Sequence, residues 1–514
     1  MQLRPSRVRR RSPLIALTAA LALAVALPAS TLGDHGFPNP APYVALTAAA
    51  GEGQIVPLIN SGDAFAGVVF EGIPDGIGVV PGDGSVDLYV THEQSHVPFM
   101  GFADFQDSSV SRVTVDIEHQ QVLGLDVALS PDLGFIRFCS AFMAGPNQGF
   151  DDYTFFVNEE SNDIIDVVPG APYGPDPAVA PYRQAGYAAA LDTSNGSVTT
   201  LTRMGRHNHE NTVVVPGGWK WTASLSGDDT FTAPSSQLYL HTANDPAQVL
   251  SDKGQLWAFQ VTATDEGSVD SFDPFNNAND FLEINLGDDW SGRFIHVPSD
   301  VARGVTDVAP QTALENWSNE NNVFQFVRVE DIAYDPDSPR TVYFADTGVS
   351  RLAEDPDTGR LERLASGGIT SRGRIFQMVL NEKDPRIVDS FSILAEAGDL
   401  PEGGMDNPDN LDVNSNSIMV QEDASNARVW RYDRDAEMWT WVATATQPTA
   451  ETSGIVDVSD WFGDGWWALD VQSHVNESEG TEELTYVTPI TGAELQYKER
   501  REDGQLLLMQ IPGS

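Results

Sequence analysis

Short runs of β-branched and aromatic residues recur along the chain, and this recurrence constrains the fold more than any other feature. The runs are separated by turns drawn from 44 glycines and 32 prolines, and long helical periodicity is scarce. Runs of this composition between such turns predict strands. We expect strands at residues 86–90, 153–157, 237–240, 255–261, 341–345, 417–420, 428–432, 438–442 and 466–471.

The segment 417–444 shows the local arrangement best. Three of the expected strands follow one another there, separated by the acidic turns 422–426 and 433–435. Three antiparallel strands in succession make up most of one blade of a β-propeller. No linker rich in Pro, Ser or Gly and no block of like charge divides the chain, so the sequence favours one large β structure.

Several of the expected strands end in polar side chains that can bind metal ions. These are His92-Glu93, Glu159-Glu160, Asp346, Glu422-Asp423, and Gln472 with His474. In a β-propeller the innermost strand of each blade runs to the same end of the central channel, which would bring these side chains to one mouth. Their unequal spacing indicates long insertions rather than a strict repeat. The sequence therefore predicts an all-β fold, a single six-bladed β-propeller with long inserted loops.

The N-terminus has the form of an export signal. Five arginines precede an uncharged apolar segment, 14–27, which is shorter than the roughly 20 residues that a transmembrane helix needs. We expect residues 1–29 to be a signal peptide and residues 30–514 to form the propeller domain. The mature chain would then be periplasmic or extracellular, with no membrane-spanning segment. Arg10-Arg11 loosely resembles a twin-arginine signal, and an ordinary basic segment fits equally well.

The chain is strongly acidic, with 75 acidic residues against 29 basic ones and a net charge of −46. Removal of the signal would take away five arginines and no acidic residue, which leaves about −51. Nucleic acid and anionic membranes are poor partners for such a chain. An acidic surface with only four lysines suits salty surroundings or divalent cations. We expect a monomer that acts on a small molecule.

Cys139 is the only cysteine, so it cannot form an intramolecular disulfide. An exported lone thiol can form an intermolecular bridge, lie buried as an inert side chain, or bind a metal as a thiolate. Two carboxylates, Glu159 and Glu160, stand at the end of the apolar run that follows it. Their position favours the metal site, and the inert side chain remains the alternative.

The sequence gives little support to a zinc protease, a serine hydrolase or a nucleotide-binding enzyme. Residues 92–96 read His-Glu-Gln-Ser-His, the zinc-protease pattern, which requires a helix to place both histidines on one face. A strand leads into this motif and Pro98 follows it, so we do not expect a zinc protease. No nucleophile elbow, Walker loop or dinucleotide fingerprint is present. Residues 355–359 echo a calcium loop and are more typical of a β-turn.

Three groups of polar residues are more informative. The first is 205–210 together with 227–229, the second is 328–331, and the third is 407–410. Hard cations such as calcium take carboxylate and amide oxygens, while iron accepts carboxylates together with a thiolate. Arg328 lies among these acids. It can form a structural ion pair, or its planar fork can bind two phosphate oxygens.

Taken in order, these segments resemble the PhoX-type alkaline phosphatases, exported bacterial β-propeller enzymes that hold iron and calcium at the channel mouth. Each match is weak alone, and their common order is specific. The matching segments are 70–76 with 92–93, Cys139 with 156–160, 205–210 with 227–229, 328–332 with 343–345, 408–411, and 471–474.

The resemblance implies roles for individual residues. Cys139, Glu210 and Glu330 match the iron-binding thiolate and carboxylates, and Arg328 matches the residue that holds the phosphate. The calcium-binding set would comprise Glu159, Asp228, and Asp409 or Asn410. Val329 and Asn158 depart from the family pattern, where proline and glutamate are usual, which suggests a divergent branch whose substrate differs.

The leading hypothesis is a metal-dependent phosphomonoesterase outside the cytoplasm, with calcium and iron as cofactors and a small phosphorylated substrate. A phosphate monoester is a dianion, so a chain this acidic needs local positive charge, which clustered metals and Arg328 would supply. One alternative is a catalytically silent propeller that binds a ligand or partner and uses calcium as a structural ion. Another is a phytase-like or lactonase-like propeller hydrolase.

Overall fold

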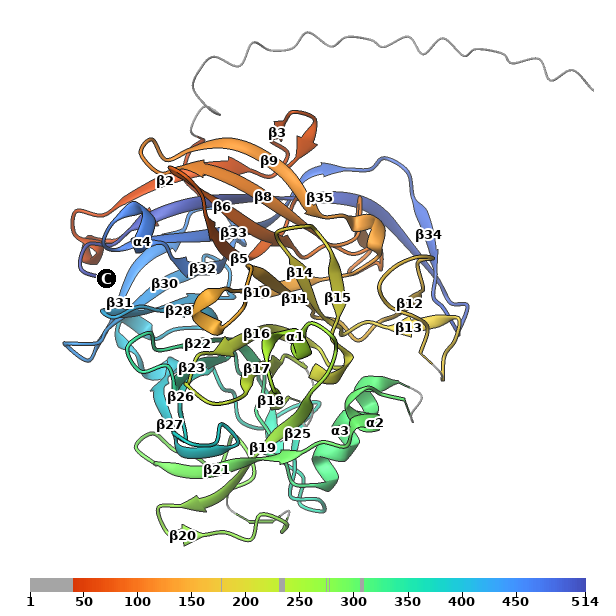
Figure 1. The fold of residues 1–514 in the computed structure, drawn as a ribbon, viewed down its shortest axis with the longest axis vertical. Coiled ribbons are helices and arrows are strands. Elements are labelled where there is room, and N and C mark those ends of the chain that lie inside the picture. Colours follow the sequence, from red (N-terminus) through yellow and green to blue (C-terminus); the bar gives the residue numbers. More distant parts are fainter. Residues whose placement is uncertain (1–39, 177, 231–235, 274, 277, 306–308) are drawn as a thin grey trace, which may run out of the picture. The chain divides into compact units, whose positions relative to one another are not determined.

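The strands form six antiparallel blades around a central channel, which confirms the predicted six-bladed β-propeller (Figure 1). The computed structural model describes residues 40–176, 178–230, 236–273, 275–276, 278–305 and 309–514. The expected signal peptide lies outside these residues. The innermost strand of each blade packs against those of the two neighbouring blades, and the sixth packs against the first, so the ring closes.

Each blade has four principal strands, which follow one another from the channel outward. Blade one comprises β5 (Pro74–Pro81), β6 (Ser85–His92), β8 (Ser109–Asp116) and β9 (Gln121–Leu129). Blade two comprises β10 (Phe138–Ala144), β11 (Thr154–Glu159), β14 (Ala188–Asp192) and β15 (Val198–Thr200). Blade three comprises β16 (His209–Val215), β17 (Thr222–Asp228), β18 (Leu238–Ala243) and β19 (Gln255–Thr264). Blade four comprises β22 (Val329–Tyr334), β23 (Thr341–Asp346), β26 (Arg374–Leu380) and β27 (Ile387–Glu396). Blade five comprises β28 (Pro408–Val413), β29 (Ser417–Glu422), β30 (Arg428–Asp433) and β31 (Met438–Ala445). Blade six comprises β32 (Glu451–Asp457), β33 (Trp466–Glu479), β35 (Glu494–Gln510) and β2 (Gln54–Asn60).

The ring is closed by strands from both ends of the described chain. β2 pairs with β35 as the outermost strand of blade six, although some 450 residues separate them. β1 (Val44–Leu46) extends blade five by pairing with β31. β21 (Trp290–His296) pairs with both β19 and β27 and so joins blades three and four. These pairings hold neighbouring blades together through backbone hydrogen bonds.

Insertions between the blade strands carry the remaining elements. The described helices are short, and none is long and apolar enough to cross a membrane. These elements are α1 (Pro246–Val249), α2 (Ser299–Ala302), α3 (Pro310–Glu320), α4 (Ser459–Phe462), β3 (Ala64–Phe65), β4 (Val68–Val69), β7 (Phe102–Asp104), β12 (Ile164–Asp166), β13 (Tyr182–Gln184), β20 (Gly267–Ser268), β24 (Leu352–Glu354), β25 (Leu361–Arg363) and β34 (Leu484–Val487).

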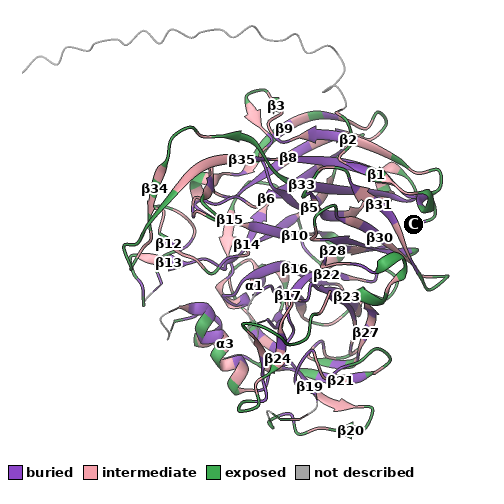
Figure 2. Cartoon of the chain, turned by 180° about the vertical axis from the view of Figure 1, so that it is seen from behind, coloured by how far each residue is buried: buried purple, intermediate pink, exposed green. Residues whose placement is uncertain are grey.

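Apolar side chains fill the space between neighbouring blades. Leu88 of blade one and Leu506 of blade six belong to one cluster and are fully buried, and β16 is buried along its whole length (Figure 2). Full burial of such a side chain contributes about 1.5–3 kcal/mol. Because protein interiors are close-packed, this core fixes where each innermost strand places its side chains.

Every strand expected from the sequence overlaps an observed strand, but the place within the blades of the strands with polar ends was predicted wrongly. The expected strands with polar ends, such as β6 and β11, are the second strands of their blades and not the innermost ones. Neighbouring strands are antiparallel, so the second strand ends where the innermost strand begins. The starts of the innermost strands and the ends of the second strands therefore meet at the same mouth.

Candidate metal centre

Each innermost strand carries a β-bulge near its start, opposite the end of the second strand. In β5, for example, one extra residue interrupts the pairing between Pro74 and Ile77. A bulge re-aims the side chain at its position, and the propeller repeats the bulge around the channel. The first residues of the six bulges are Asp75, Cys139, Glu210, Glu330, Asp409 and Gly454. Five blades thus present an acid or a thiol at the same level of the channel.

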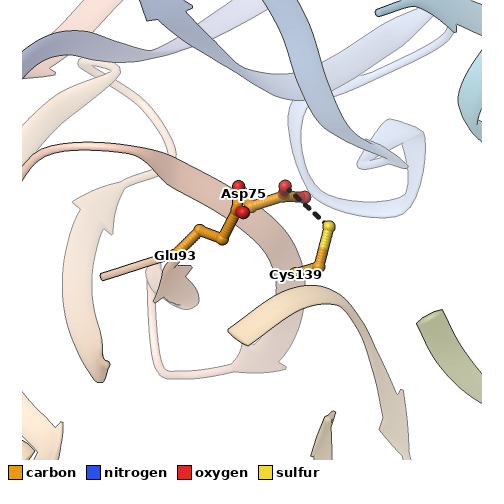
Figure 3. Close-up of side chains that lie close together, drawn as sticks. All are labelled: Asp75, Glu93 and Cys139. Atoms are coloured by element: carbon orange, nitrogen blue, oxygen red, sulfur yellow. Dashed lines mark hydrogen bonds between the residues drawn. The ribbon is translucent and has the colours of Figure 1, made fainter. Parts of the chain in front are cut away.

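These side chains form a continuous group together with residues that follow the second strands. Three sets have ligand atoms within 4.8 Å of one another: Asp75, Glu93 and Cys139; Cys139, Glu160 and Glu210; and Glu210, Glu330 and Asp409. Cys139 and Glu210 each belong to two sets and so link all three. We call these seven residues the channel cluster. Figure 3 shows the first set, in which the Cys139 thiol donates to Asp75 Oδ2 over 3.3 Å.

Several oxygens of the channel cluster lack hydrogen-bond donors. Both carboxylate oxygens of Glu210, Oδ1 of Asp75 and Oδ1 of Asp409 are buried, and no described residue donates to them. A buried carboxylate without a donor is costly unless a cation or a proton compensates it. Carboxylate oxygens are the ligands that calcium prefers, and iron accepts carboxylates together with a thiolate. The cluster residues therefore fit bound cations.

The electrostatics of the cluster support the same conclusion. Burial raises the pKa of Asp75 to about 6 and that of Glu93 to about 8. Burial, together with repulsion from neighbouring carboxylates, also raises the pKa of Glu210 and Glu330 well above the usual range. Negative charge packed this closely is stable only when cations or protons neutralise it.

Arg328 brings a positive charge to the edge of the cluster. Its guanidinium donates from Nε to Asp229 Oδ1 over 2.7 Å and from Nη2 to Asp229 Oδ2 over 3.0 Å. Nη2 also lies 3.0 Å from Oε1 of Glu330, a cluster residue. The ion pair considered from the sequence is thus present, and it fixes the orientation of the guanidinium beside the cluster.

A cavity of about 730 Å³ opens beside the cluster and is lined by Glu93 and Glu160 among others. The zinc-protease motif lies at its edge without forming a helix, as expected: His92 ends β6, is fully buried and contacts Gly72 O and Ser111 Oγ. Within the motif, Glu93 and Ser95 line the cavity, and His96 is partly exposed and contacts Asp107.

Comparison with known proteins identifies the family. The family described as Alkaline phosphatase PhoX matches residues 173–454, more than half of the chain. The chain belongs to the PhoX alkaline phosphatase family. No curated protein sequence matches it.

Among solved structures, Pseudomonas fluorescens PhoX in complex with vanadate, a transition state analogue, matches with a TM-score of 0.59 at 14% identity, covering 93% of this chain and 97% of that chain. Kuenenia stuttgartiensis hydrazine synthase matches with a TM-score of 0.36 at 10% identity, covering 85% and 99%. The PhoX match supports the propeller fold. Family membership supports an alkaline phosphatase-like phosphoesterase with a metal-dependent site.

Four residues that the PhoX resemblance singled out as metal ligands lie in the channel cluster, namely Cys139, Glu210, Glu330 and Asp409. Asn410 occupies the second bulge position of β28, where its amide donates to Ser140 Oγ over 2.7 Å and its Oδ1 accepts from Ser453 Oγ over 3.0 Å. Asn410 therefore ties blades two, five and six together beside the cluster.

Glu159 and Asp228, which the PhoX resemblance assigns to the calcium-binding set, lie outside the channel cluster. Both oxygens of Glu159 bind the fully buried Arg183, at 2.6 and 2.7 Å. Asp228 accepts from the Thr230 hydroxyl over 2.7 Å. Each is the last residue of a second strand and pairs with the residue before a bulge, Glu159 with Phe138 and Asp228 with His209. Of the residues that follow them, Glu160 belongs to the channel cluster and Asp229 binds Arg328.

The pair Glu159 and Glu160 offers a matched test of which of the two adjacent acids binds metal. We expect Glu159→Gln to lower the free energy of unfolding by about 3 kcal/mol, because Arg183 is left as an uncompensated buried charge, with the metal content unchanged. Glu160→Gln should lower the metal content with little loss of stability. Chemical denaturation and elemental analysis of both variants check this. Metal loss in Glu159→Gln with full metal in Glu160→Gln would reverse the assignment.

The site residues that the resemblance implies do not include Asp75, Glu93, Glu160 or Asp229, although the pattern of polar strand ends placed Glu93 and Glu160 at the channel mouth. A usable signal existed for three of them, because each directly follows the last residue of a second strand, at an end where two polar residues stand together. Asp75 had no such signal. It reaches the channel only through the bulge in β5, and no local sequence pattern predicts that bulge.

Proposed function

We propose that this member of the PhoX family is a metal-dependent phosphomonoesterase that hydrolyses phosphate esters at the channel cluster. The observation that carries the proposal is the convergence of six carboxylates and one thiol, several of them with buried oxygens that lack donors, beside an oriented arginine. We further propose that the protein acts outside the cytoplasm after removal of residues 1–29, with residues 30–514 as a single domain.

The donor types favour a division of the cluster between two kinds of metal. Cys139, Glu210 and Glu330 would hold iron, because iron accepts a thiolate together with carboxylates. Asp75, Glu93, Glu160 and Asp409 supply further oxygens of the kind that calcium prefers. When bound, such ions neutralise ester oxygens and lower the pKa of bound water.

Arg328 is the residue that we expect to position the phosphate. Asp229 binds its guanidinium through two hydrogen bonds, so its direction is set before substrate arrives. A planar fork held in this way matches two oxygens of a phosphate group. It would stabilise the charge that spreads over the equatorial oxygens as the ester bond breaks.

Replacement of Arg328 tests this role. We expect Arg328→Lys to lower kcat/KM for p-nitrophenyl phosphate by about 10²-fold, because lysine keeps the charge and loses the fork. Circular dichroism and metal content should stay as in the wild type. Arg112→Lys, which alters an ion pair with Asp126 on the outer part of blade one, is the matched control and should leave turnover intact.

Two outcomes would count against the proposal. Wild-type turnover in Arg328→Lys would remove the arginine from the phosphate site. Stoichiometric calcium without iron, together with no hydrolysis of any phosphate ester, would favour the silent calcium-stabilised propeller over an enzyme.

A further inference from the structure

The cavity beside the channel cluster has an apolar wall whose role the proposed function leaves open. Glu93 and Glu160 of the cluster line the cavity, and so do Ile73, Val97, Pro98, Phe99 and Phe102. We propose that this wall binds the alcohol part of the substrate and selects phosphate monoesters of apolar, above all aromatic, alcohols. The inference rests on the proposed phosphomonoesterase function and adds a substrate class to it.

The wall is built on a tight hairpin. The Phe99 N–H donates to Phe102 O over 2.6 Å, and the Phe102 N–H donates to Phe99 O over 3.0 Å. The two residues between them, Met100 and Gly101, have φ values of 51° and 84°. Positive φ at both central positions is the requirement of a type I′ turn, the tightest common hairpin connection. The two phenylalanines therefore stand at fixed positions on either side of the turn.

Contacts beyond the turn hold the hairpin in place. β7 begins at Phe102 and pairs in parallel with Lys498–Arg500 of β35. The Asp104 N–H donates to Ser95 O over 2.9 Å, and Asp104 Oδ2 accepts from the Ser95 N–H over 2.9 Å. The Arg500 guanidinium lies 4.9 Å from the centre of the Phe102 ring. Because the wall is already ordered, a ligand that binds it does not lose affinity to the cost of ordering the protein.

The ring of Phe99 is available to a ligand, because 64% of the residue is exposed, whereas Ile73 and Val97 of the same wall are buried. A ligand that covers Phe99 removes apolar surface from water, at about 25 cal/mol for each Å². Ligand sites commonly combine an apolar wall with a few polar groups that fix orientation. Here the channel cluster would hold the phosphate and the wall would hold the rest of the ester.

The charges around the cavity argue against a second anionic group on the substrate. The lining holds five carboxylates against three arginines and one histidine. Arg137 binds Asp163, Arg500 binds Glu502, and His474 lies 2.9 Å from Glu502. Arg137 and Arg500 are thus paired with acids, and carboxylates outnumber the cations of the lining, so a polyphosphate leaving group would meet repulsion. A neutral alcohol meets none.

Two esters of the same chemical reactivity test the inference: 2-phenylethyl phosphate and ethyl phosphate, which differ by one phenyl group. With the metal-loaded wild type, we expect kcat/KM to be about 10-fold higher for the phenylethyl ester. Phe99→Ala should lower that value about fivefold and leave ethyl phosphate within twofold. Met100→Ala is the matched control, because Met100 belongs to the same turn, is 83% exposed and does not line the cavity.

Binding of the corresponding phosphonates, measured by calorimetry, gives a readout that does not depend on turnover. Phe99→Ala should weaken 2-phenylethylphosphonate and not ethylphosphonate. Equal kcat/KM for the two esters in the wild type, or equal effects of Phe99→Ala and Met100→Ala, would overturn the inference and leave the phosphatase standing. A preference for ATP over the phenylethyl ester would overturn it as well. Hydrolysis of no ester at all would contradict the proposed function and, with it, this inference.

Discussion

Cys139→Ala is expected to lower phosphatase turnover by about 10³-fold and to remove the bound iron. Cys139 is the only sulfur ligand in the channel cluster and belongs to two of its three sets, so its loss breaks the link between them. Alanine leaves a small gap in a buried position and removes a donor that no neighbour can replace. Turnover of p-nitrophenyl phosphate and the iron-to-protein ratio measure the effect.

Met143→Ala on the same strand is the control for a general loss of packing. Met143 is partly buried, packs against the core between blades one and two, and belongs to no set of the channel cluster. We expect this variant to be less stable by about 2 kcal/mol and to keep its iron and its turnover. Full activity and full iron in Cys139→Ala would instead return Cys139 to the role of a buried inert side chain.

Removal of the metals is expected to lower the thermal midpoint at pH 8 by about 10 °C. Bound ions stabilise a folded protein in proportion to the logarithm of their excess over Kd, and without them the carboxylates of the channel cluster repel one another. Differential scanning calorimetry with and without chelator measures the shift. Glu210→Gln removes the carboxylate that joins two sets, so the metal-free variant should regain part of the lost stability.

The pH dependence of the metal-free protein follows from the direction of the pKa shifts. In the folded state the pKa of Asp75 is raised to about 6 and that of Glu93 to about 8. A group with a raised folded pKa stabilises the protein at low pH, and this contribution is lost as the pH rises through the folded value. The metal-free protein should therefore lose stability between about pH 5 and pH 8. Equal thermal midpoints at pH 5 and pH 8 in the presence of chelator would show that the channel cluster does not concentrate negative charge.

The blades could be predicted from the sequence because their signal is local. Runs such as 86–90 and 417–420 carry β-branched residues and end at turns, and both are strands in the structure. The closure of the ring could not be predicted in this way. It depends on the pairing of β2 with β35, which lie at opposite ends of the described chain.

The candidate site could be predicted to within one residue at two positions. Glu159 and Glu160 are adjacent acids, and the sequence does not show which of them ends the strand and which faces the channel. Register decides this, because neighbouring residues of a strand point to opposite sides. The same ambiguity exists for Asp228 and Asp229, which are also adjacent acids at the end of a strand. The bulges add a further offset, and it is the bulge in β10 that places Cys139 in the channel.

The most direct test of the central claim is p-nitrophenyl phosphate hydrolysis by one preparation before chelation, after chelation and after return of calcium and iron, with elemental analysis at each step. We expect hydrolysis with iron and calcium bound, its loss when the metals are removed, and its recovery when both are returned. Hydrolysis that persists in the metal-free protein, or none at any metal content, would contradict the assignment of the channel cluster as a metal-dependent phosphatase site.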